Sequence, residues 1–170
     1  MSRCGVVTVA LCALSLTGCL SHPQTAAEFR QAVPGAATAG MDTFEVNRPL
    51  AQVAASFQKL ASDCLGRTIR TTEHQPHVSY QVVTTTYKPT VLVSANQAEL
   101  HVQQRHRGNV INVSAEPDGG YYLLVADARP VGPARTRVDL YRPSMGHGAL
   151  VQAVRSWAAG DNAGCPDLIG

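Results

Sequence analysis

Apolar residues recur at helical spacing in two segments of the chain. The first is NRPLAQVAASFQKLASDCLG, residues 47–66, where apolar side chains fall every three or four positions and so share one side of a helix. Pro49 suits the first helical turn, and Gly66 is placed to end the helix. The second is SMGHGALVQAVRSWAAG, residues 144–160, with a similar apolar stripe that stops at Gly160. The pattern therefore predicts two main helices.

Between the two helices, apolar and polar residues alternate, which is typical of half-buried strands. Turn residues such as Lys88-Pro89 and Asp118-Gly119 separate these strands, and short connections favour antiparallel neighbours. A short strand at 43–46 precedes the first helix. We predict an α+β fold, an antiparallel β-meander with both helices packed on one face, in the order strand, helix, several strands, helix. The alternating segments lie at 78–84, 100–102, 111–113, 121–125 and 138–140.

The N-terminal residues have the form of a secretory signal. Arg3 supplies a positive charge, and the apolar run from Val6 to Leu16 is too short to span a bilayer, which takes about 20 residues. The run ends in LTGC, residues 16–19, which resembles the lipobox of bacterial lipoproteins.

The lipobox resemblance implies a location. In that family the polypeptide is cut before the cysteine, here Cys19. The thiol of this cysteine then carries a diacyl group, and its new amino group is acylated as well. Stable anchoring in a membrane takes more than one acyl chain. A residue other than aspartate at the next position, here Leu20, implies sorting to the outer membrane. We therefore expect a signal peptide at 1–18 and a lipid-anchored protein of the cell envelope, with a single domain at 42–170 in the periplasm.

Residues 20–41 contain many small side chains and two prolines, and they show no sustained apolar period. We expect the lipidated Cys19 and this segment (19–41) to form a flexible tether that spans about 25 Å on average. A short helix over 25–32 is compatible with the sequence, but nothing in the sequence requires it. Deletion of residues 20–40 is accordingly expected to change the melting temperature very little.

Charge and cysteine content narrow the possible functions. The formal net charge is +2 and no block of basic residues occurs, so nucleic acid is not an expected partner.

Of the five cysteines, Cys4 and Cys12 fall in the predicted signal, and Cys19 is used for lipid. Cys64 and Cys165 remain as a pair in an oxidising compartment, so we predict a disulfide between them.

Two further resemblances concern the domain itself. The opening segment FEVNRPLAQVAASFQKL and the closing segment ALVQAVRSWAAG look like the START-like helix-grip superfamily, in which a curved antiparallel sheet wraps a C-terminal helix, often around an apolar cavity. The segments GGYYLLVADARP, RTRVDLYR and WAAGDNAGCPDL resemble a group of proteobacterial envelope lipoproteins. The second resemblance implies anchoring and a disulfide, and it indicates no particular activity.

Residue types used in catalysis and metal binding are present, but their patterns do not indicate an active site. We interpret His74 and His77 as solvated loop histidines, because no further ligand pattern completes a metal site. Ser144, His147 and Asp139 are the residue types of a hydrolase triad, but they lack the G-x-S-x-G elbow. We therefore expect no enzyme activity, no metal and no cofactor.

Aromatic residues supply one candidate binding site. Core packing is the commoner role of such side chains, but four of them could line a groove for an apolar ligand: Tyr80, Tyr121, Tyr122 and Trp157. The leading hypothesis is a non-catalytic interaction or structural module, held at the membrane by its lipid, with an envelope protein as partner. The alternative is a binding protein or carrier for an apolar or lipid-like ligand in a START-like groove.

Overall fold

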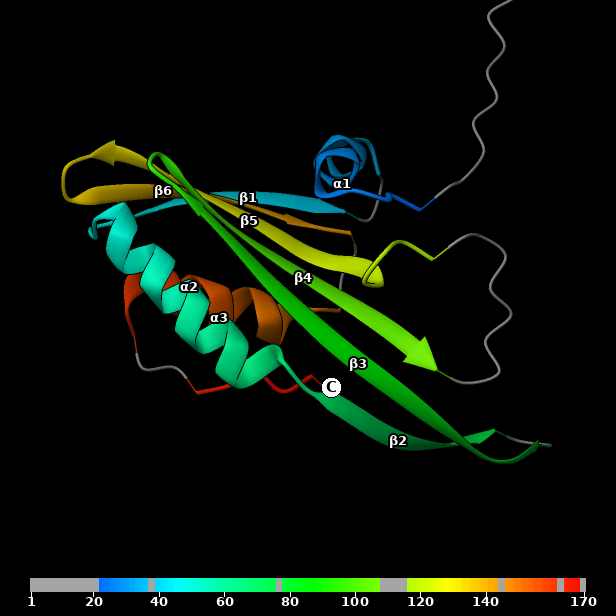
Figure 1. Cartoon of the computed structure of the whole chain (residues 1–170). Helices are drawn as coiled ribbons and strands as arrows, with labels where there is room; N and C mark the ends of the chain where they lie inside the picture. The colour runs from blue at the N-terminus through cyan, green and yellow to red at the C-terminus, as the bar shows by residue number, and fades with distance from the viewer. Residues whose placement is uncertain are drawn as a thin grey trace, which may run out of the picture.

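An antiparallel sheet of six strands forms the centre of the computed structural model (Figure 1). The elements are α1 (Ala26–Ala32), η1 (Val33–Gly35), β1 (Gly40–Val46), α2 (Leu50–Leu65), β2 (Thr68–Gln75), β3 (Val78–Ser94), β4 (Gln97–Arg107), β5 (Tyr121–Gly132), β6 (Arg135–Arg142) and α3 (Gly148–Ala159). Strands β2 to β6 follow one another as a meander, and β1 pairs with β6 at the far edge. The predicted α+β class with an antiparallel sheet is confirmed.

The structure describes the chain over residues 22–36, 39–75, 78–107, 116–143, 146–161 and 164–168, without the side chains of 73–75 and 78–81. The strand predicted at 111–113 and the proposed lipid site at Cys19 lie outside these residues.

Helices α2 and α3 lie side by side on one face of the sheet, which we call the inner face (Figure 1). The apolar stripe of each helix meets inward-facing strand residues in the main hydrophobic core, where each fully buried large side chain contributes about 1.5–3 kcal/mol. The large side chains of this core that have almost no exposed surface include Trp157, Phe57, Leu65, Leu100, Leu124 and Leu140. The inner face therefore supplies most of the buried apolar surface of the described domain.

Arg48 joins the start of α2 to the end of α3. Its Nη1 donates to the carbonyl oxygens of Trp157 (3.1 Å) and Ala158 (3.0 Å), which lie in the last helical turn, where carbonyls lack partners within the helix. Gly160 then ends α3 with a φ of +86°, and a Cβ at this residue would lie 2.8 Å from the Arg48 guanidinium carbon. The positive φ therefore favours glycine here, and a Cβ would also require the Arg48 guanidinium to move from its position at the end of α3.

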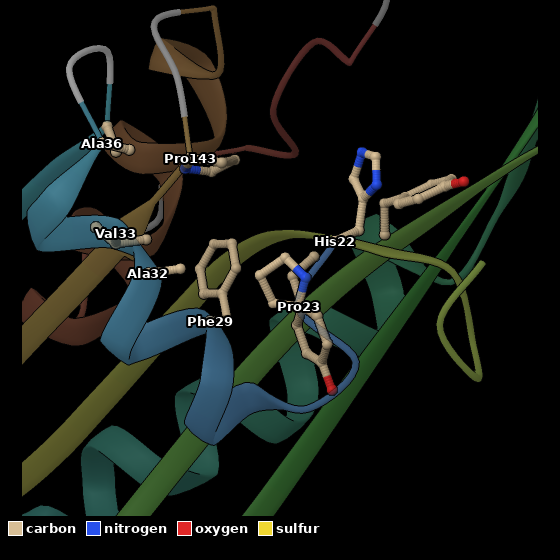
Figure 2. A pocket seen from close by; sticks show the side chains of 10 residues that line it. His22, Pro23, Phe29, Ala32, Val33, Ala36 and Pro143 are labelled. Carbon is tan, nitrogen blue, oxygen red and sulfur yellow. The ribbon is translucent and has the colours of Figure 1, made fainter. Parts of the chain in front are cut away.

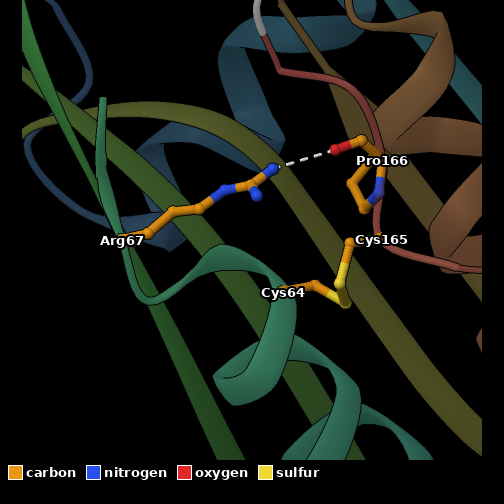
Figure 3. The surroundings of a disulfide bond; sticks show 4 residues. All are labelled: Cys64, Arg67, Cys165 and Pro166. Carbon is orange, nitrogen blue, oxygen red and sulfur yellow. Dashed lines mark hydrogen bonds between the residues drawn. A yellow bond between two sulfur atoms is a disulfide. The ribbon is translucent and has the colours of Figure 1, made fainter. Parts of the chain in front are cut away.

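The predicted disulfide between Cys64 and Cys165 is confirmed (Figure 3). The two Cα atoms lie 5.0 Å apart, and the bond closes a loop with a sequence separation of 101 residues. A loop of this length corresponds to about 4.7 kcal/mol in the chain-entropy model. Arg67 Nη2 donates to the Pro166 carbonyl oxygen at 3.0 Å, so the C-terminal segment is held to the end of α2 by two adjacent contacts.

The prediction of a flexible tether is wrong for residues 22–36. Helix α1 packs on the opposite face of the sheet, which we call the outer face (Figure 1). The described domain therefore has a third helix in addition to the two that were predicted. Phe29 and Val33 are each only 3% exposed, and with Val125 of β5 they form a second, smaller hydrophobic core. Tertiary packing of this apolar side, rather than helix propensity, stabilises so short a helix.

Replacing Phe29 with alanine should therefore lower the free energy of unfolding by about 3 kcal/mol, because the side chain is removed from a buried site. Chemical denaturation of the purified protein, followed by circular dichroism, measures this. Gln31→Ala is the matched control, since Gln31 is exposed on the same helix and its loss should change stability by less than about 0.5 kcal/mol. Equal, small effects of both substitutions would restore the tether interpretation.

Candidate functional site

Three carboxylates lie in one row across the outer face of the sheet. Glu99 of β4, Asp127 of β5 and Asp139 of β6 are opposite one another in the strand register, and we call them the carboxylate row. Asp127 is only 1% exposed. Like charges directly opposite on neighbouring strands destabilise a sheet, and a buried carboxylate needs a partner. The row therefore requires cations close to it.

Arg30 of α1 supplies the central cation. Its Nη2 contacts Glu99 Oε2 and donates to Asp127 Oδ1 at 2.6 Å. His101 Nε2 lies 2.8 Å from the same oxygen of Glu99, so this carboxylate is held from two sides. Because Arg30 is the residue next to Phe29, the ion pairs and the small hydrophobic core dock α1 together.

Two half-exposed arginines complete the network from the solvent side. Arg129 lies 3.5 Å from Asp127 Oδ2 and 3.7 Å from Asp139 Oδ2, and Arg137 Nε donates to Asp139 Oδ1 at 3.1 Å. Thr43 Oγ1 also donates to Asp139 Oδ1, at 2.8 Å. Each carboxylate of the row thus contacts at least one arginine, which favours a structural role for the row over proton transfer.

The local charges shift the pKa values of the network in opposite directions. Burial of Glu99 alone would raise the pKa of its carboxyl, but the hydrogen bonds with His101 and Arg30 outweigh burial and lower that pKa below its ordinary value. Burial also works against the charged form of Arg30, yet its bonds to Asp127 and Glu99 raise its pKa. Both partners therefore stay ionised at neutral pH.

An apolar pocket of about 210 Å³ lies between α1 and the beginning of β5 (Figure 2). The rings of Phe29 and Tyr122 lie 5.5 Å apart, and the His22 ring meets Tyr121 edge-on at 4.8 Å. Burial raises the pKa of the Tyr122 hydroxyl, so this side chain is neutral at physiological pH. The other lining residues are Pro23, Ala32, Val33, Ala36, Ala39 and Pro143.

The structure brings together only part of the predicted aromatic groove. Tyr121 and Tyr122 line the pocket under α1. Trp157 does not join them, because it lies on α3 at the inner face and has no exposed surface. The side chain of Tyr80 lies outside the described residues.

Of the residues weighed for catalysis or metal binding, Asp139 belongs to the carboxylate row. The side chain of His74, together with His77 and Ser144, lies outside the described part of the chain. Within that described part, no three His, Cys, Asp or Glu side chains are grouped so as to hold a metal ion.

Sequence reasoning missed the docking of α1, although one local signal was present. Thr25 and Glu28 form the T-x-x-E pattern of a helix start, and the Glu28 amide donates to Thr25 Oγ1 at 3.1 Å. Phe29 and Val33, four positions apart, then mark one helix side. No comparable signal identifies Arg30 as the partner of the carboxylate row.

In comparisons with known proteins, no protein family and no curated protein sequence matches this chain. No helix within residues 22–168, as far as they are described, is long and apolar enough to cross a membrane.

The lowered pKa of Glu99 predicts how the stability depends on pH. A carboxyl whose pKa is lower in the folded state stabilises the fold above its unfolded pKa, and this contribution is lost as the pH falls through the folded pKa. Wild type should therefore be more stable than Glu99→Gln at pH 7, and the difference should shrink steadily as the pH is lowered below about 4. Urea denaturation of both proteins across the acid range measures it. A difference that is independent of pH would show that the Glu99 charge does not hold α1.

Proposed function

We propose that this protein is a lipid-anchored envelope protein whose domain serves as a non-catalytic interaction module at the periplasmic face of the outer membrane. The lipobox-like LTGC, which places the anchor at Cys19, supports the anchoring. The observation that carries the proposal is the docking of α1, because His22 already contacts Tyr121 of the sheet. Only two residues, Leu20 and Ser21, separate Cys19 from His22, and the three Cα–Cα steps between these residues span at most ~10 Å.

This short connection gives the domain a fixed relation to its anchor. A free tether of about 22 residues would leave the domain at an average distance of ~25 Å and in any orientation. With α1 docked on the outer face, an anchor at Cys19 would lie on that side of the domain, and helices α2 and α3 cover the opposite, inner face. The domain therefore presents one defined surface to the membrane and another to the periplasm, as an interaction module requires.

Cys19→Ala should abolish lipidation, because no other residue next to the predicted cleavage site offers a thiol for acylation. We expect loss of incorporated radiolabelled palmitate and transfer of the protein from the membrane fraction to the soluble fraction. Cys12→Ala is the matched control, since Cys12 lies in the predicted signal and should be dispensable for labelling. A Cys19→Ala protein that kept its label would refute the anchor.

The pocket under α1 supports a second candidate function, the binding of an apolar or lipid-like ligand, and it does so at a different place from the START-like groove. Its lining is almost entirely apolar and includes Phe29, Val33 and Tyr122. At about 210 Å³ it is smaller than the ~300 Å³ at which pockets for drug-sized molecules begin, so only part of an acyl chain would fit.

Native mass spectrometry of the purified protein tests this second function. We expect a co-purified apolar molecule that is lost in Ala32→Trp, because the indole fills the pocket beside Ala32. The control is Gln31→Trp, which adds the same side chain at a neighbouring exposed position that does not line the pocket. A molecule retained by Ala32→Trp, or none in wild type, would exclude the pocket as its site.

A further inference from the structure

Four basic side chains lie on the outer face beyond the end of α1, and we call them the basic strip: Arg70, Lys88, Arg105 and Arg107. The strand register places Arg70 of β2 and Arg107 of β4 on either side of Thr84 in one row. Arg105 is opposite Thr86, two residues along β3, and Lys88 is opposite Gln103. Since side chains two positions apart share a face, all four project to the same side of the sheet. All four are exposed.

The basic strip carries uncompensated positive charge. Arg105 pairs with Glu116 at 3.1 Å, but no carboxylate of the described chain lies within 4.0 Å of Arg70, Lys88 or Arg107. Arginines at the opposite end of the outer face differ in this respect. Arg135, for example, pairs with Glu45 at 3.3 Å, and Arg129 and Arg137 contact the carboxylate row. The strip is thus a local basic surface on a chain whose net charge is only +2.

One end of the basic strip lies close to His22, the first described residue of the chain. The Lys88 ammonium lies next to the turn at Gly119, where a Cβ would be 3.1 Å from its Nζ. Gly119 precedes Tyr121 by two residues, and the His22 ring rests on Tyr121. His22, the first described residue, therefore lies near the Lys88 end of the strip.

We propose that the basic strip faces the membrane and binds the phosphate groups of anionic phospholipids in the leaflet that holds the anchor. The inference rests on the proposed lipid anchoring at Cys19. Guanidinium groups bind phosphate oxygens through paired hydrogen bonds, and an unpaired arginine has these donors free. Each basic residue near an anionic membrane surface raises the equilibrium constant for membrane binding about 5-fold.

Distance decides whether this attraction operates. Charges in physiological salt are screened over about 8 Å. A flexible tether would hold the domain ~25 Å away, where the attraction is negligible. The three Cα–Cα steps from Cys19 to His22 reach at most ~10 Å, so with α1 docked an anchor at Cys19 would hold the Lys88 end of the strip near the range at which lipid charge is felt. The helix that fixes the domain thereby turns its basic surface to the membrane.

The test uses the full, lipidated protein in vesicles of phosphatidylcholine alone or of phosphatidylcholine with phosphatidylglycerol. A fluorophore on Thr86→Cys, an exposed position beside Arg105, reports contact with lipids that carry a quencher on the head group. A fluorophore on Gln58→Cys, exposed on α2, reports the opposite side. Vesicle flotation first establishes that the protein is anchored, so failure of the anchor is seen separately from failure of the strip.

We expect quenching at Thr86→Cys that is stronger with phosphatidylglycerol, falls with added salt and exceeds quenching at Gln58→Cys. In the anchored protein, Arg70→Gln/Arg107→Gln should reduce the ratio of domains whose strip contacts the membrane to domains whose strip does not by about 25-fold. The control Lys59→Gln/Arg135→Gln removes two exposed charges elsewhere and should leave the ratio unchanged. Flotation without this difference between the two vesicle types, or an equal effect of both double variants, would overturn the proposal.

Discussion

The placement of Arg30 between Glu99 and Asp127 is the interaction on which the arrangement of the molecule depends. Asp127 is almost completely buried on a sheet face where two further carboxylates flank it. Removing one partner of such a buried pair typically costs about 3–5 kcal/mol, because the remaining charge stays desolvated. The outer face of the sheet is therefore complete only when α1 lies on it, and the segment leading to the predicted anchor becomes part of the fold.

The two faces of the sheet consequently differ in how they are covered. The inner face is covered by two amphipathic helices over a large apolar core, with the disulfide fixing the C-terminal segment. The outer face is covered only in part, by a short helix that combines a small apolar contact with ion pairs. Apolar burial involves no titrating group and is not weakened by screening, whereas ion pairs depend on pH and weaken as the ionic strength rises. The packing of α1 on the outer face therefore depends on pH and ionic strength more than the packing of α2 and α3 on the inner face does.

Much of the fold could be predicted from the sequence, because long periodic segments and cysteines carry local signals. The spacing of apolar residues in 47–66 and the pairing of Cys64 with Cys165 are examples. The docking of α1 was not predicted, because it depends on the register of β4, β5 and β6 and on contacts of Arg30 with residues 69 and 97 positions later in the sequence. Asp127 and Asp139 look like solvent-facing positions of a half-buried strand until β4, β5 and β6 are aligned.

The aromatic site shows the same limit. Tyr122 is opposite Gln103 and Leu124 is opposite Val102, so an irregularity in β5 leaves Leu123 as an extra residue. Leu123 and Leu124 are therefore both buried in the inner core, while Tyr122 turns to the pocket under α1. Such a shift cannot be read from alternation alone. Trp157 was grouped with the tyrosines by residue type alone, and it belongs to the other face because it lies on the apolar stripe of α3.

The position of α1 also determines how the domain bears mechanical load. A force applied through the N-terminal segment would, without α1, act on Gly40, the first residue of edge strand β1, and could open its pairs with β6 one at a time from Arg142 onward. With α1 docked over β5, the same pull first meets Phe29, Val33 and Arg30, which must all separate together. The short helix thus shields the edge strand and passes the load to the middle of the sheet, where every strand has neighbours on both sides.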